Sequence, residues 1–210
     1  MCFDLDGCLV DSRAAIPRSI NAALDQLGLP QQDENDLVRF IGPPLAASLR
    51  TLLDELGGDP DRAVEALGAY RDAYPDLARD HTTVVAGMRQ VLTSLTPSKE
   101  LRVVTSKPAA FAVPILEAMD LADHFAEVHA PALDELEQPK SDTLSQALDV
   151  AGMPAEHTAM VGDHPADVRA GRVNGTATVG VTWGTASRAE LEDAGADVVV
   201  DEPAELLKLF

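Results

Sequence analysis

Two acidic side chains lie two residues apart near the start of the chain, directly after a short apolar run. They are Asp4 and Asp6, and Gly7 follows them. If residues 1–3 form a strand, Asp4 stands at its carboxyl end, where open α/β sheets place ligand chemistry. Gly7 permits a sharp turn, so both carboxylates can face one crevice. Crowded carboxylates need a cation or a shared proton, and Mg²⁺ is a natural partner for oxygen ligands.

A second segment that could do chemistry is Thr105-Ser106-Lys107, which follows an expected strand. A hydroxyl group and free backbone N–H groups at a strand end can hold a phosphate. Taken alone, however, this tripeptide is more typical of an ordinary turn.

A third segment, Gly162-Asp163-His164-Pro165-Ala166-Asp167, follows another expected strand and opens a helix. Asp163 and Asp167 are four residues apart, so they lie near one helical face. Pro165 suits a first helical turn. The alternative is that these acids only complement the helix dipole. Lys140 precedes a further expected helix; a lone lysine there is normally a surface charge.

The pattern of the elements shows how these segments come together. From about Leu101 onward, short apolar strands alternate with amphipathic helices, which predicts an α/β fold with a doubly wound parallel sheet, Rossmann-like and covered on both faces. The expected strands are 1–3, 101–105, 124–130, 158–162, 176–182 and 197–200. The expected helices are 109–119, 141–151, 166–173, 187–194 and 203–209.

Between the first two strands the sequence has no strand pattern. Apolar residues recur at helical spacing over 14–27, 36–41, 45–56 and 60–70, separated by Gly- and Pro-rich turns. This predicts a helical bundle inserted into the sheet domain. We expect a core domain of residues 1–11 and 84–210 and a cap domain of residues 12–83, with a hinge near Ser12 and Thr83.

Composition excludes some classes of function. The chain has 210 residues and a formal net charge of −19, which disfavours nucleic acid and anionic membrane surfaces as partners. No apolar run reaches membrane-spanning length, and no secretory signal is visible. Cys2 and Cys8 are too close in sequence for a disulfide between them to cross-link distant parts of the fold. They are therefore expected to be reduced thiols of a cytoplasmic protein.

The order of these motifs resembles the haloacid dehalogenase superfamily, over essentially the whole chain. The helical insert resembles that superfamily's C1-type cap. Segments such as Ile41-Gly42-Pro43-Pro44-Leu45 and Thr105-Ser106-Lys107-Pro108 are similar to its phosphoglycolate phosphatase and 5'-nucleotidase-like branch. The resemblance implies a phosphatase that acts on a small phosphorylated metabolite, with phosphoglycolate as the leading named substrate, as a monomer or homodimer.

The resemblance also implies roles for individual residues. Asp4 resembles the nucleophile and a metal ligand, and Asp6 resembles the general acid/base, with its backbone carbonyl as a further ligand of Mg²⁺. Asp163 resembles the acidic metal ligand, with Asp167 as its support. The implied phosphate-binding set is Gly7, Thr105, Ser106 and Lys140.

Some alternatives stay open at this point. Another alignment places Gln138 at the position of Lys140 and leaves Lys107 as the lysine that pairs with phosphate. A phosphomutase similar to β-phosphoglucomutase, or a non-catalytic binding protein with the same fold, would share most of the pattern. Cys8 stands where Thr is common, and His164 is unusual within its motif; a simple loop position is favoured for His164.

Overall fold

The computed structural model describes residues 1–135 and 138–210 of the chain. Its centre is a six-stranded sheet in which all neighbouring strands are parallel, with the order β5-β4-β1-β6-β7-β8. The fold class predicted from the sequence is therefore confirmed. The strands are β1 (Cys2–Phe3), β4 (Arg102–Val104), β5 (Glu127–His129), β6 (Ala159–Gly162), β7 (Ala177–Val181) and β8 (Val198–Val200).

The shortest of these strands, β1, lies in the middle of the sheet. Phe3 is fully buried and is paired with Val103 of β4 on one side and with Val161 of β6 on the other. The chain builds outward from β1 in one direction through β4 and β5, and then in the other direction through β6, β7 and β8. The carboxyl end of β1 is thus the point where the strand order reverses, which is where open α/β sheets bind ligands.

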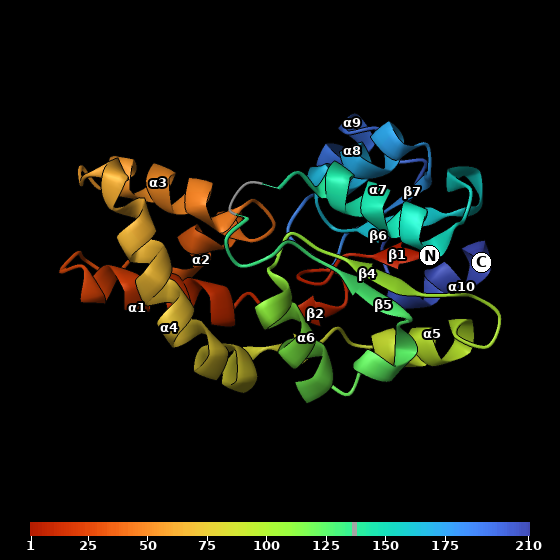
Figure 1. Cartoon of the computed structure of the whole chain (residues 1–210), viewed down its shortest axis with the longest axis horizontal. Helices are drawn as coiled ribbons and strands as arrows, with labels where there is room; N and C mark the ends of the chain where they lie inside the picture. The colour runs from red at the N-terminus through yellow and green to blue at the C-terminus, as the bar shows by residue number, and fades with distance from the viewer. Residues whose placement is uncertain (136–137) are drawn as a thin grey trace.

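Helices cover both faces of this sheet (Figure 1). One face carries α5 (Met88–Leu95), α6 (Ala109–Ala118) and the short α10 (Leu206–Leu209), and the other carries α7 (Lys140–Ala151), α8 (Pro165–Asn174) and α9 (Arg188–Asp193). The expected capping box of α9 is present, because the Ser187 and Glu190 side chains each accept a hydrogen bond from the other residue's backbone N–H. Helix α5 was not predicted.

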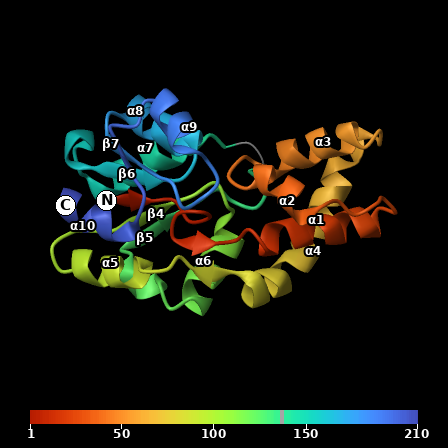
Figure 2. The ribbon, with the colours of Figure 1, turned by 180° about the vertical axis from the view of Figure 1, so that it is seen from behind.

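Four further helices lie beside the sheet rather than on it (Figures 1 and 2). They are α1 (Ala15–Gln26), α2 (Glu34–Leu37), α3 (Leu45–Glu55) and α4 (Ala63–His81). They form the helical cap inserted after β1, and α1 packs along α4. Short 3₁₀ segments occur at Val38–Phe40, Pro60–Arg62, Ala122–His124, Ala155–His157 and Pro203–Glu205.

The sequence prediction for α4 was wrong at its carboxyl end. A helix was expected over 60–70, whereas α4 continues to His81 with Pro75 inside it. Proline removes one helical hydrogen bond, but Tyr74 and Ala78 on either side of it are buried. Tertiary packing of this apolar face therefore outweighs the local cost.

The two connections between cap and core are joined to each other. Strand β2 (Val10–Asp11) pairs antiparallel with β3 (Thr83–Val84) in a two-stranded ribbon that the sequence did not predict. This ribbon lies where a hinge was expected. Both cysteines, Cys2 and Cys8, are buried and free. Among the described residues, no helix combines the length and apolarity that a membrane crossing requires.

Packing of the cap can be tested at Leu24, which is fully buried on α1. We expect Leu24→Ala to lower the free energy of unfolding by about 2–5 kcal/mol, because it removes a buried side chain and leaves a cavity. Urea denaturation measures the effect. The control is Leu207→Ala, the same change at a side chain that is 40% exposed; an equal loss in both variants would contradict the packing described here.

Candidate active site

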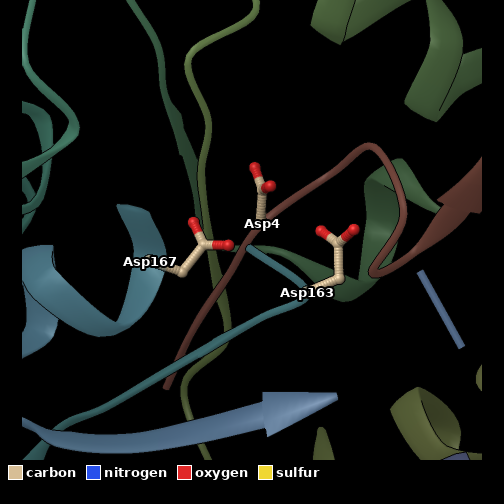
Figure 3. A group of neighbouring side chains, drawn as sticks. All are labelled: Asp4, Asp163 and Asp167. Carbon is tan, nitrogen blue, oxygen red and sulfur yellow. The ribbon is translucent and has the colours of Figure 1, made fainter. Parts of the chain in front are cut away.

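Three acidic side chains converge at the carboxyl ends of β1 and β6. Asp4 follows β1, Asp163 follows β6, and Asp167 lies in the first turn of α8. One carboxylate oxygen from each lies within 4.8 Å of the others (Figure 3), and the three residues are at most 2% exposed. The parallel register produces this arrangement, since the Asp4 N–H donates to the Val161 carbonyl oxygen at 2.9 Å. The convergence of Asp4 and Asp163 proposed from the sequence is thus present in the structure.

Glycines leave the space that these carboxylates occupy. A Cβ atom built on Gly7 or on Gly184 would lie 2.2 Å from the Asp163 carboxylate, and one on Gly162 would lie 2.2 Å from that of Asp167. Gly7 also has φ +79°, which favours glycine. Gly184 and Gly162 were not identified as site residues from the sequence.

The Asp163 carboxylate is held by a residue that sequence reasoning missed. The backbone N–H and the hydroxyl group of Thr185 both donate to Asp163 Oδ2, each at 2.8 Å. Thr185 follows β7, the neighbour of β6 in the sheet. The signal available in the sequence was a hydroxyl residue just beyond the end of an expected strand.

Asp167 joins the site through the start of α8. Its Oδ2 accepts a hydrogen bond from the His164 N–H at 3.0 Å, while His164 Nδ1 accepts one from the Ala166 N–H at 3.1 Å. His164 is therefore the N-cap of α8, a more specific role than the loop position expected.

Lys140 is the cation beside the three carboxylates. It is the first residue of α7, and its Nζ lies 2.8 Å from Asp4 Oδ1 and 2.5 Å from Asp167 Oδ1. Its side chain is 4% exposed. The pKa of Lys140 is raised because these two carboxylates outweigh the burial that opposes its charge. Of the two lysines considered, Lys140 is the one that contacts Asp4.

Lys107 instead contacts the other acid of the first motif. Its Nζ donates to Asp6 Oδ1 at 2.8 Å and to the hydroxyl group of Tyr74. Thr105 is buried, and its Oγ1 accepts a hydrogen bond from the Lys107 N–H at 3.1 Å. Asp6 is 7% exposed, and its carboxylate is not one of the three that group together at Asp4, Asp163 and Asp167.

The crowding of acids changes their ionisation. Burial, the largest cause, raises the pKa of Asp4 to about 6, against the opposing effect of the Lys140 ammonium. Burial and the neighbouring Asp4 raise the pKa of Asp163 to about 7, although its hydrogen bonds from Thr185 act in the other direction. These carboxylates therefore lack sufficient positive charge around them. Three buried carboxylates around one ammonium group fit a hard divalent cation, whose charge would reverse both shifts.

A pocket between cap and core opens onto this site. From the core it is lined by Asp4, Asp6, Thr105, Ser106, Lys107 and Lys140, and from the cap by Phe40, Leu45, Leu67, Tyr70 and Tyr74, among others. The structure thus brings Asp4, Asp6, Thr105, Ser106 and Lys140, to which the family resemblance assigned site roles, to one cavity. Asp163 and Asp167 do not line this pocket but adjoin it through Asp4 and Lys140, and Gly7 lines a neighbouring pocket.

Comparison with known proteins agrees with this geometry. The family model for haloacid dehalogenase-like hydrolases matches residues 1–181. The chain is 36% identical over 190 residues to a 5'-nucleotidase of Pseudomonas aeruginosa, covering 90% of this chain and 85% of that protein. It is 34% identical over 213 residues to a phosphoglycolate phosphatase of Chromobacterium violaceum, covering 99% and 94%.

A solved structure of a predicted phosphatase from Clostridium acetobutylicum superposes with a TM-score of 0.91 at 32% identity, covering 99% of this chain and 95% of that one. The chain belongs to the haloacid dehalogenase-like hydrolase family. The resemblance identified from the sequence is confirmed, and so is the expected class of enzyme, a phosphatase of this family.

The raised pKa values predict how stability depends on pH. A carboxyl group whose pKa is raised on folding binds more protons when folded, so the contribution of Asp163 to the free energy of unfolding falls as pH rises from about 4 toward about 7. We expect Asp163→Asn to reduce this fall, because the amide does not ionise but still accepts hydrogen bonds from Thr185. Urea denaturation at pH 5 and pH 8 in the presence of a chelator measures it. Identical pH dependence in both proteins would contradict the assignment.

Proposed function

We propose that this protein is a Mg²⁺-dependent hydrolase of small phosphomonoesters that works through a phosphorylated Asp4. The observation that carries the proposal is the placement of the Asp4 carboxylate. It contacts Lys140 at 2.8 Å, belongs to a buried group of three carboxylates, and faces the pocket lined by Thr105 and Ser106. A nucleophile, counter-charges and a phosphate-binding turn are thereby within reach of one substrate.

In the first step, a carboxylate oxygen of Asp4 attacks phosphorus and the bond to the leaving oxygen breaks. Asp6 donates its proton to that leaving oxygen, which departs as an alcohol. In the second step, Asp6 takes a proton from a water molecule that attacks phosphorus, and the bond to Asp4 breaks. Inorganic phosphate leaves, and both carboxyl groups return to their starting states.

Other residues hold the phosphoryl group during these steps. The Thr105 and Ser106 hydroxyl groups and the backbone at Gly7 bind its oxygens, and Lys140 neutralises charge between Asp4 and the substrate. Asp4, Asp163, Asp167 and the backbone carbonyl of Asp6 would hold Mg²⁺. When bound, the cation reduces the repulsion between a carboxylate and a phosphate dianion and aligns the two.

We also propose that residues 12–83 act as a cap that closes over the substrate, with residues 1–11 and 84–210 as the core. The antiparallel ribbon of β2 and β3 is the connection about which the cap would move. The cap supplies aromatic and apolar side chains to the pocket, so it excludes water and contacts the leaving group.

The relatives suggest two substrates, a nucleoside 5'-phosphate and phosphoglycolate. We propose that the substrate is a small phosphorylated metabolite and that a panel of phosphomonoesters, including these two, identifies it. Release of inorganic phosphate without added sugar bisphosphate separates this hydrolase from a phosphomutase. Any turnover that depends on Asp4 separates it from a non-catalytic binding protein.

The nucleophile assignment predicts the effect of Asp4→Asn. The amide keeps the shape and the acceptor for Lys140 but cannot attack phosphorus, so we expect kcat to fall at least about 1,000-fold. Phosphate release measures the loss, and circular dichroism confirms an unchanged fold. Normal turnover in this variant would refute a phosphorylated Asp4.

Metal removal gives a second test. We expect a chelator to stop phosphate release and Mg²⁺ to restore it at constant ionic strength. Mg²⁺ is also expected to raise the midpoint of thermal unfolding, since it binds only the folded site. Asp163→Asn should weaken this thermal shift, whereas Asp76→Asn, at an acid with a 78% exposed side chain, should not. Full activity in chelator, or an unchanged shift in the site variant, would contradict the assignment.

A further inference from the structure

One hydrogen-bonded chain runs from the cap into the core and ends on the acid/base residue. The Lys107 ammonium donates to Asp6 Oδ1 at 2.8 Å and to the hydroxyl group of Tyr74. Lys107 follows β4 in the core, whereas Tyr74 belongs to α4 of the cap. The side chains of Lys107 and Asp6 are 7% and 10% exposed, so this contact is largely shielded from solvent.

The position of Tyr74 is itself fixed by packing from both sides. Its ring stacks on Tyr70 of the same cap helix, with 5.0 Å between the ring centroids. It also forms a T-shaped pair with Phe111 from α6 of the core, with 5.3 Å between the centroids. The Lys107 ammonium also lies 4.6 Å from the centroid of the Tyr74 ring, within the range of a cation–π interaction. The ammonium group is therefore held at two points, one on each domain.

We infer that Lys107 is a positioning residue that aims the Asp6 carboxyl group at the leaving oxygen, and that Tyr74 makes this aim depend on a closed cap. This inference rests on the proposed acid/base role of Asp6. A lysine side chain has a long flexible stem, and a single contact to Asp6 would leave it many conformations. The Tyr74 contact removes that freedom only when the cap lies against the core, so proton transfer is coupled to closure.

The inference differs from a phosphate-binding role for Lys107 in a measurable way. A lysine that binds phosphate stabilises every phosphomonoester, whatever the leaving group. A lysine that aims the general acid matters most when the leaving oxygen needs a proton. Phenyl phosphate and p-nitrophenyl phosphate have rings of similar size, but p-nitrophenolate leaves without protonation far more readily than phenolate.

The experiment compares kcat/KM for these two esters in wild-type protein, Lys107→Met, Lys107→Arg and Tyr74→Phe. We expect Lys107→Met to lower kcat/KM for phenyl phosphate about 100-fold, the usual scale of general acid catalysis, and that for p-nitrophenyl phosphate less than tenfold. Lys107→Arg should recover part of the loss because it keeps a donor to Asp6. Tyr74→Phe should lower kcat/KM for phenyl phosphate, relative to p-nitrophenyl phosphate, by about fivefold, which is the scale of one hydrogen bond.

A matched control isolates the effect. Lys208→Met makes the same chemical change on the exposed surface and should leave both values unchanged. If Lys107→Met lowers kcat/KM equally for both esters, the inference is overturned in favour of phosphate binding. If Lys107→Met leaves both kcat/KM values unchanged, Lys107 has no role in the reaction.

Asp6→Ala separates failure of this inference from failure of the proposed function. A changed ratio in Asp6→Ala together with an unchanged ratio in the Lys107 and Tyr74 variants would overturn the positioning role alone. An unchanged ratio in Asp6→Ala would overturn the acid role of Asp6 and the inference with it. Should Lys107→Met fail to fold, the ratios of Lys107→Arg and Tyr74→Phe decide the question.

Discussion

The structure depends on one unfavourable arrangement, the burial of three carboxylates at the point where the strand order reverses. Asp4, Asp163 and Asp167 are held there by the strand ends, by Thr185 and by the N-terminus of α8. Lys140 offsets part of the repulsion, yet the pKa values of Asp4 and Asp163 remain raised. Such strain persists only where the surrounding fold determines it fully, and here a buried parallel sheet and three glycines do so.

Much of this could be predicted from the sequence, because the responsible signals are local. Apolar strands followed by acids, a hydroxyl or a glycine indicated the sheet and its ligand edge, and Asp4, Asp6, Thr105, Lys140 and Asp163 reach one site as expected. The choice between Lys140 and Lys107 could not be made, because it depends on how close the turn after β4 and the start of α7 come to Asp4 and Asp6 in space. The structure places Lys140 on Asp4 and Lys107 on Asp6.

The features that the sequence did not reveal are mostly products of tertiary contact. Helix α4 runs through Pro75 because its buried face packs against α1. The ribbon of β2 and β3 pairs strands of two residues each, separated by the whole cap, and such short strands have no periodicity to detect. Thr185, which follows β7, donates hydrogen bonds to Asp163 at the end of the neighbouring strand β6, and Gly184 leaves space for the Asp163 carboxylate. None of these relations is encoded within a single stretch of sequence.

The charge balance of the site connects the proposed roles of the metal ion and the cap, because both bear on how the site accommodates a phosphate dianion. Asp4, Asp6, Asp163 and Asp167 bring four carboxylates, whereas Lys107 and Lys140 bring two ammonium groups that are already bound to them. These residues therefore offer no excess of positive charge to a phosphate dianion that enters the site, and the protein as a whole has a net charge of −19. A divalent cation would make up this local deficit. In the proposed mechanism the cap would complete the site by excluding water, which strengthens the remaining charge interactions. It would also fix Lys107 through Tyr74, so that Asp6 is aligned with the leaving oxygen only when the substrate is enclosed.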